Sequence, residues 1–158
     1  MAMKNTLKGA LVGLTVLASG LALADDGKVV CPAGTKKVGG PSTEMRTSTC
    51  VNAQGDFHGP YVVFDEAGRV ASRGTVKNGM RDGVFTFYDT KGAVVGETRF
   101  TAGNYDGKRV KYFASGKPKL IENYVKGNRE GVQQEFSEDG ALVSAVEYKA
   151  DRRVASAK

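Results

Sequence analysis

The sequence predicts an all-β protein: an antiparallel meander of stacked 24-residue β-hairpin repeats that form one elongated, curved single sheet. Three ladders of glycines and one ladder of aromatic residues predict this fold, because all four recur every 24 residues without a gap. The ladders are Gly55, Gly79, Gly103 and Gly127; Gly59, Gly83, Gly107 and Gly131; Gly68, Gly92, Gly116 and Gly140; and Phe64, Tyr88, Tyr112 and Phe136. A fixed period in this range is the signature of a repeat architecture.

Residues 1–24 are predicted to be a secretory signal peptide that is separate from the fold. Lys4 and Lys8 supply a positive n-region, residues 9–23 are uncharged and apolar, and Ala22–Ala24 fit the small-x-small cleavage rule. The apolar run is shorter than the roughly 20 residues that a membrane span needs. We therefore expect an exported chain, periplasmic or extracellular after cleavage, that does not span a membrane.

Residues 25–50 are predicted to form an N-terminal cap that is closed by a disulfide. Cys31 and Cys50 are the only cysteines, and an even number in an exported chain indicates a disulfide. A catalytic thiol would need a basic partner, and His58 is the only histidine. The residues before Cys31 also lack the small side chains of a lipid-attachment motif. Such a cap would protect the first edge strand from pairing with another chain.

Each repeat within residues 51–150 is predicted to be one hairpin. Candidate first strands, rich in β-branched and aromatic residues, lie at residues 60–64, 84–88 and 109–113. A turn that ends in glycine, such as Asp89–Gly92, leads to a second strand, such as residues 93–101. A glycine-rich loop, such as Asn78–Gly83, then passes the chain to the next hairpin. We expect no helix, because glycines recur often, those of the repeats sit at turns, and no 3.6-residue period is sustained.

Alternation along these strands predicts one apolar face and one polar face. The aromatic ladder is expected on the apolar face, together with Val70, Val94, Leu142, Val76, Phe100, Tyr124 and Tyr148. The polar face is expected to carry Arg73, Thr75, Glu97, Arg99, Lys119 and Glu147. Because no helix is available to cover the apolar face, we expect the sheet to curl on itself and neighbouring hairpins to bury one another.

The repeats resemble the MORN repeat, in the variant found in a bacterial antitoxin-like family of the YwqK type. The matching features are a glycine with an aromatic residue five positions later, the turn glycine, the aromatic residue before the loop, and a Gly-x-x-acid-Gly loop. The loop acids are Asp82, Asp106 and Glu130, with His58 at the same place in the first repeat. Two features depart from the family: the chain has no tryptophan, and Asp151 replaces the last loop glycine. The resemblance implies a meander of hairpins with a binding or scaffolding role.

The sequence carries no pattern that indicates catalysis, a metal site or a cofactor. Catalysis needs convergent groups with tuned pKa values, whereas the loop acids fall one per repeat and are spaced along an edge. His58 is predicted to be a turn residue. The net charge of +6, or +4 without Lys4 and Lys8, is a mild excess without a dense basic cluster, so no nucleic-acid partner is expected.

One loop position carries an arginine or an aromatic residue in every repeat. The residues of this candidate binding row are Phe57, Arg81, Tyr105, Arg129 and Arg153. Such side chains recognise anionic or sugar-bearing partners, and a solvated loop edge is the alternative. Residues 151–158 are expected to form a basic C-terminal tail.

The sequence therefore predicts an exported, non-enzymatic interaction module. Its expected partner is another protein or an anionic component of the cell envelope. Two alternatives stay open: an envelope immunity or antitoxin-like protein, and a binder of anionic lipid or of cell-wall glycan.

Overall fold

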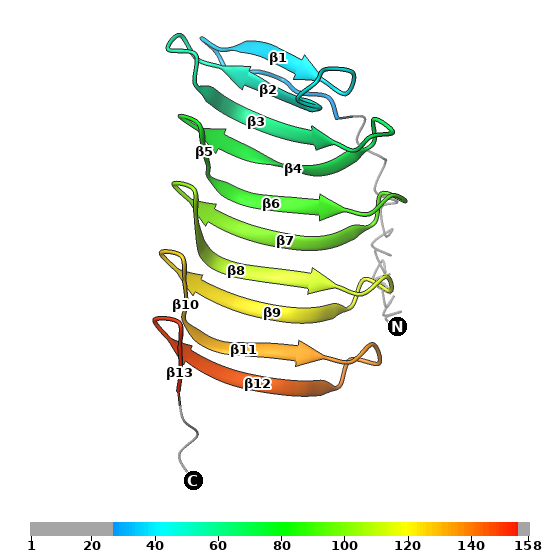
Figure 1. Cartoon of the computed structure of the whole chain (residues 1–158), viewed down its shortest axis with the longest axis vertical. Helices are drawn as coiled ribbons and strands as arrows, with labels where there is room; N and C mark the ends of the chain where they lie inside the picture. The colour runs from blue at the N-terminus through cyan, green and yellow to red at the C-terminus, as the bar shows by residue number, and fades with distance from the viewer. Residues whose placement is uncertain (1–26, 155–158) are drawn as a thin grey trace, which may run out of the picture.

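The computed structural model describes residues 27–154, and the predicted signal peptide and the end of the predicted basic tail lie outside them. The described residues form one antiparallel sheet of 13 strands and contain no helix (Figure 1). Strand order in the sheet follows strand order in the chain, which makes the sheet a meander. The predicted fold class is thereby confirmed.

The strands come as hairpins that follow one another down the sheet. Their bounds are β1 (Lys36–Gly40), β2 (Thr47–Val51), β3 (Phe57–Phe64), β4 (Val70–Lys77), β5 (Met80–Arg81), β6 (Gly83–Tyr88), β7 (Val94–Thr101), β8 (Asn104–Tyr112), β9 (Pro118–Val125), β10 (Asn128–Arg129), β11 (Gly131–Phe136), β12 (Leu142–Lys149) and β13 (Arg152–Arg153). The two-residue strands β5, β10 and β13 pair with the ends of β4, β9 and β12.

Different turns close the two ends of each hairpin. The four-residue turn appears as predicted: Gly92 has a φ of 82°, and its N–H donates to the Asp89 carbonyl oxygen at 3.0 Å. At the other end Asn78 and Gly79 have φ values of 49° and 77°, and β5 pairs with β4 directly after them. Positive φ at both central residues is the two-residue hairpin turn that matches the twist of the strands. The predicted loop Asn78–Gly83 is thus shortened to a two-residue turn, because Met80 and Arg81 already pair with β4.

A β-bulge beside the four-residue turn interrupts the alternation of side chains in each repeat. Phe87 pairs with Gly96, but the next residue, Tyr88, pairs with Val94, so that Val95 is an extra residue on its strand. The same shift of register occurs after Val63, Lys111 and Glu135. An extra residue moves the side chains beyond it to the other face of the sheet.

The bulge separates two sets of side chains that were predicted to share one face. One face, which we call the aromatic face, carries Phe57, Tyr61, Phe85, Phe100, Tyr105 and Tyr124, whose neighbouring ring centroids lie between 5.1 and 6.2 Å apart. The opposite face carries the ladder residue Tyr112, whose hydroxyl donates to the Glu97 carboxylate at 2.9 Å. The prediction that the aromatic ladder lies beside Phe100 and Tyr124 was thus wrong.

The aromatic face is buried largely by its own neighbours, within a single layer. Phe85 is only 1% exposed and forms a buried cluster with Val76 and Phe100. Its ring lies against Gly74 in β4, where a Cβ atom would come within 2.5 Å of Phe85 Cδ2. Gly74 and Gly96 therefore contradict the prediction that the repeat glycines sit only at turns. Because adjacent strands supply this burial, the sheet stays open and does not curl on itself.

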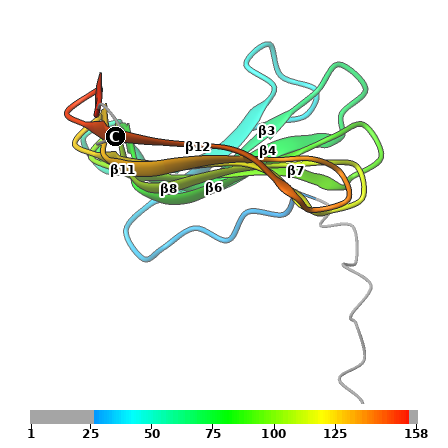
Figure 2. The ribbon, with the colours of Figure 1, turned by 90° about the horizontal axis from the view of Figure 1, so that it is seen from below.

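The segment before β1 crosses the opposite face at the first hairpins and is drawn in blue in Figure 2. Val29 packs there with Cys50, Val62 and Phe64 in a second buried cluster. Cys31 and Cys50 form the predicted disulfide, with Cα atoms 5.6 Å apart. The residues predicted to form a cap thus comprise this crossing segment and the strands β1 and β2, which extend the sheet itself.

Candidate functional site

The structure places the predicted binding row on the aromatic face, at the hairpin ends that have two-residue turns. Its members are Phe57 in β3, Arg81 in β5, Tyr105 in β8, Arg129 in β10 and Arg153 in β13. Four of them pair with equivalent residues of the preceding strand, namely Val76, Phe100, Tyr124 and Tyr148. The row therefore lies in strands rather than in loops, because the two-residue turns before its last four members lead straight back into pairing.

Arg81 lies over the aromatic core. Its guanidinium carbon lies 5.1 Å from the ring centroid of Phe85 and 5.2 Å from that of Phe100. Two cation–π contacts on one guanidinium restrict the orientation of the side chain. Among residues 27–154 no carboxylate forms an ion pair with Arg81. Its positive charge therefore faces solvent in a fixed orientation.

Tyr105 lies between Phe100 and Tyr124 in the ring series, with its ring centroid 5.1 Å from both. The Arg109 guanidinium lies 5.8 Å from the Tyr105 ring and donates to the Glu122 carboxylate at 2.9 Å. Burial alone lowers the pKa of Arg109, but its hydrogen bond with Tyr124 and the charge of Glu122 raise that pKa overall. Arg109 is thus a cation that is neutralised within its own repeat.

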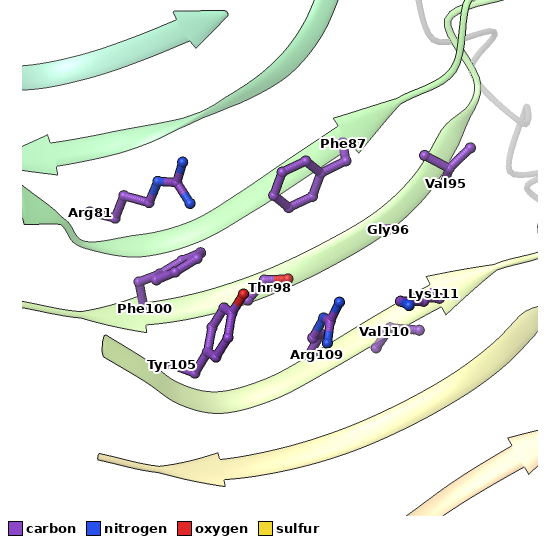
Figure 3. A pocket seen from close by; sticks show the side chains of 10 residues that line it. All are labelled: Arg81, Phe87, Val95, Gly96, Thr98, Phe100, Tyr105, Arg109, Val110 and Lys111. Atoms are coloured by element: carbon purple, nitrogen blue, oxygen red, sulfur yellow. The ribbon is translucent and has the colours of Figure 1, made fainter. Parts of the chain in front are cut away.

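A groove of about 450 Å³ opens on the aromatic face between Arg81 and Arg109 (Figure 3). Its side chains include Arg81, Phe87, Thr98, Phe100, Tyr105, Arg109 and Lys111. Three of these are cationic, and Glu122 balances only Arg109, so the groove has an excess of positive charge. Its size lies within the range of ligand pockets. This combination suits an anionic group that is attached to an apolar or aromatic body.

Arg81 and Tyr105 of this groove were predicted from the sequence as binding residues, whereas Thr98, Arg109 and Lys111 were not. Arg109 belongs to a 24-residue series of its own, which consists of Tyr61, Phe85, Arg109 and Gln133. The sequence could have placed that series on the aromatic face, but only if the alternation of side chains had been corrected for the extra residue at each bulge.

A second groove of about 190 Å³ lies further along the same face, beside Arg129. The Arg129 guanidinium carbon is 4.2 Å from the ring centroid of Tyr148, and its Nε lies 2.9 Å from the Asp151 carboxylate. The hydrogen bond with Asp151 raises the pKa of Arg129, and the hydrogen bond with Arg129 lowers the pKa of Asp151. Glu122 and Glu135 also line this groove, which therefore lacks the positive excess of the first.

The loop acids of the repeat motif bind turns. Glu130 accepts from the N–H of Ala150 at 2.8 Å, and Asp106 accepts from the N–H of Lys126 at 3.3 Å. Both contacts span 20 residues, which links one repeat to the turn of the next. His58 makes the equivalent contact to the Asn78 side chain at 3.1 Å, although it lies in β3 and not in a turn as predicted. Within residues 27–154 no three His, Cys, Asp or Glu side chains gather as a metal site would require.

The fold and this surface define the class of the protein as an open sheet of β-hairpin repeats with one face lined by arginines and aromatic rings. Residues 105–126 and 129–150 match the family model described as MORN repeat variant. The two matched segments are adjacent and cover the last two of the four regular repeats. No curated protein matches the chain. Nowhere in the described range is there a helix that is long and apolar enough to cross a membrane.

Several solved structures match the chain over part of their own length. A GtfA/B complex bound to UDP and GlcNAc is 13% identical with a TM-score of 0.45, and the match covers 80% of this chain and 27% of that one. The glycosylation-associated Gap123 complex from Streptococcus agalactiae is 15% identical with a TM-score of 0.44, over 70% and 20% of the two chains. TarM is 9% identical with a TM-score of 0.35, over 77% and 21%. This chain thus spans less than a third of each, and no function follows from such distant likenesses.

Proposed function

We propose that the protein is an exported, non-enzymatic interaction module that binds another protein with its aromatic face. The observation that carries this proposal is the unbroken series of rings from Phe57 to Tyr124, with the Arg81 guanidinium stacked on it. Aromatic residues and arginine dominate the energetically important positions of protein interfaces. The open single layer leaves Arg81 and Tyr105 exposed along one side of the sheet, above the buried rings of Phe85 and Phe100.

Three further observations support the non-enzymatic and exported parts of this proposal. Three of the groups that could act as acids or bases are held in hydrogen bonds: Asp106 and Glu130 accept from backbone N–H groups, and His58 contacts the Asn78 side chain. The Cys31–Cys50 disulfide suits an oxidising compartment outside the cytoplasm. The apolar run of residues 9–23 supplies the signal for export.

A binder of an anionic envelope component is the second candidate function. The positive excess around Arg81 and Lys111 favours it, because anionic lipid or acidic glycan would neutralise that charge. An immunity or antitoxin-like role is a narrower form of the first proposal, with one specific toxin as the partner. A single stoichiometric protein recovered from the envelope supports protein binding, and salt-sensitive retention on lipid or glycan supports the second candidate.

Site-specific photo-crosslinking tests which face binds. A photoreactive phenylalanine analogue replaces Tyr105 on the aromatic face or, as the control, Lys108 on the opposite face, where Lys108 pairs with Asn123. Both side chains are exposed. In cells that make the protein, we expect one discrete protein adduct from position 105 and none from position 108. An adduct from position 108 alone assigns binding to the opposite face and removes the proposal.

Grouped substitutions test the same assignment by loss of binding. One variant replaces Arg81, Tyr105, Arg129 and Arg153, and its control replaces Arg73, Glu97, Arg99 and Lys119. Once circular dichroism has shown that both are folded, we expect only the first to lose the crosslinked partner. Replacing an exposed loop residue changes the free energy of unfolding by roughly 0.5 kcal/mol. Tyr105 and Arg129 pack on rings, so replacing them will cost more than that.

A further inference from the structure

The repeat architecture allows Arg81 to be compared with Arg129, which stands at the same position two repeats later. The Asp151 carboxylate accepts from the backbone N–H of Arg129 at 3.1 Å and from its Nε at 2.9 Å. The backbone contact positions the Asp151 carboxylate, and the Nε contact holds the guanidinium over the ring of Tyr148. The residue that corresponds to Asp151 two repeats earlier is Gly103. Arg81 therefore has the stacking geometry of Arg129 without the carboxylate.

Arg81 is also prepared for an anion by its surroundings. The two ring contacts fix the guanidinium, so that little side-chain freedom remains to be lost when an anion binds. Figure 3 shows Arg81 and Arg109 on either side of Phe100 and Tyr105. Arg109 is already neutralised by Glu122, and the remaining charged group of the groove is the cation Lys111. The uncompensated charge of the groove is thus carried by Arg81 at one end and by Lys111 at the other (Figure 3).

We propose that Arg81 receives the carboxylate of an aspartate or glutamate side chain of the partner protein, in the position that Asp151 takes toward Arg129. The neighbouring side chain of the partner then occupies the groove beside Phe87, Thr98 and Tyr105. We favour a protein carboxylate over an acidic sugar, because the carboxylate that this chain places beside Arg129 belongs to an aspartate on a hairpin turn, Asp151. Charge-assisted hydrogen bonds to arginine are shorter and stronger than neutral ones. This inference rests on the proposed function and adds the chemistry of the partner.

A pair of peptides tests whether the carboxylate is what Arg81 recognises. The probe is a short peptide with blocked ends that contains one aspartate beside a tyrosine, and its twin has asparagine in place of the aspartate. The arginine Nε–H resonances of the disulfide-bonded protein are followed by NMR during titration. We expect the aspartate peptide to shift the Arg81 resonance and the twin to bind roughly tenfold more weakly. Equal shifts from both peptides, or no shift at Arg81, overturn the inference.

A substitution within the chain can place a competing carboxylate beside Arg81. Gly103→Asp places at Arg81 the residue that Asp151 presents to Arg129, and Gly103→Asn has the same shape without the charge. Gly103 has a φ of 82°, which Asp and Asn tolerate best among residues with side chains, and the nearest atoms to a new Cβ are 3.8 Å away on Met80. We expect Gly103→Asp to weaken peptide binding roughly tenfold, and Gly103→Asn to change it by less than roughly twofold. Equal losses from both variants exclude the charge mechanism.

The reciprocal change extends the test to the second groove. Asp151→Gly removes the carboxylate from Arg129 and should make its Nε–H resonance respond to the aspartate peptide, while Asp151→Asn serves as the control for shape. A short oligogalacturonate tests the other source of carboxylates, and tighter binding of it than of the peptide at Arg81 overturns the choice of a protein partner. If position 105 still crosslinks to a protein but the peptide fails to shift Arg81, this inference falls while the proposed function stands. Crosslinking from position 108 alone removes both.

Discussion

At the residue scale, the glycine ladders mark backbone conformations more than close contacts. Gly92 has a φ of 82°, and no atom outside its immediate neighbours lies within 4 Å of the place where a Cβ would stand. A side chain there meets open space but must adopt a left-handed backbone. Such a conformation is unfavourable for residues other than glycine and most unfavourable for β-branched ones.

Gly92→Val is therefore predicted to destabilise the protein by roughly 1–3 kcal/mol. Lys91→Val, one position earlier in the same exposed turn, should change stability far less, and Gly92→Asn should lie between them because asparagine tolerates positive φ. Equilibrium unfolding in urea measures all three. Similar midpoints for the two valine variants would show that the backbone of Gly92 is not what the turn depends on.

Some residue roles could be predicted from the sequence and others could not, for a physical reason. The turn glycines recur with the period of the fold, so their positions followed from the repeat alone. Gly74 does not recur, since Thr98, Glu122 and Val146 occupy its position in the later repeats. Its role depends on the Phe85 ring that lies against it from β6. Contact across strands of different repeats is not visible in a periodic pattern.

At the scale of the element, the hairpins were predictable but their faces were not. The period placed the strands and the four-residue turns close to where the structure has them. The extra residue at each bulge, such as Val95, leaves no mark on the period because it recurs with it. Alternation counted through the bulge therefore assigned Phe100 and Tyr88 to one face. The binding row was found by its position, while its ring contacts had to come from the structure.

The four-residue turns should make stability depend on acid pH. The Asp89 carboxylate accepts from the backbone N–H groups of Ala93 and Lys91 at 2.9 and 2.8 Å, and these bonds lower its pKa below the ordinary 3.8. The pKa of Asp65 is lowered for the same kind of reason. Its carboxylate accepts hydrogen bonds from the backbone N–H of Arg69, which has the larger effect, and from the Arg69 side chain. Because the folded pKa lies below the unfolded one, this contribution is present above about pH 4 and is lost as the pH falls through the folded pKa.

Asp89→Asn keeps an acceptor oxygen in the turn but removes the titrating group. We predict that the stability difference between the unmodified protein and this variant is larger at pH 6 than at pH 2. Urea unfolding at several pH values between 2 and 6 measures it. Parallel curves for Asp89→Asn and the unmodified protein would assign the acid sensitivity to other groups.

The N-terminal segment is tied to the sheet by a disulfide, which predicts a protein without free thiols. Titration with a thiol reagent under denaturing, non-reducing conditions should find none, and two thiols per chain would contradict the bond. Reduction opens a loop that spans 19 residues and should lower the free energy of unfolding by roughly 3 kcal/mol. A variant with serine at both Cys31 and Cys50 should show the lower stability with and without reductant.

At the scale of the whole molecule, the order of strands followed from the sequence because each repeat contacts its neighbours. A linear array of this kind has no other way to arrange consecutive hairpins than side by side. The sequence did not allow us to predict that the sheet stays open. That outcome depends on how much of each ring the adjacent strand covers, as Gly74 covers Phe85, and such coverage is a property of packing rather than of pattern.

The ring series on the aromatic face should couple the two halves of the sheet. Tyr105 is the one ring that joins Phe100 of the second repeat to Tyr124 of the third, at 5.1 Å to each. In a linear array, stability is a sum of repeat terms and of terms between neighbours, so weakening one junction lets the parts on either side open separately. Tyr105→Ala removes the side-chain part of this junction while leaving the backbone pairing of β7 with β8.

We predict that Tyr105→Ala costs roughly 1–3 kcal/mol and makes amide hydrogen exchange faster in β9, β11 and β12 than in β3 and β4. Tyr88→Ala is the matched control, because it removes the same side chain from the opposite face, outside the ring series. It should leave exchange in the two halves equally affected. Native-state hydrogen exchange measures each strand separately and so shows whether the two halves of the sheet are affected differently. If exchange became faster by the same factor in all strands of Tyr105→Ala, backbone pairing alone would hold the two halves together. The ring series would then contribute to binding of the partner rather than to coupling of the halves.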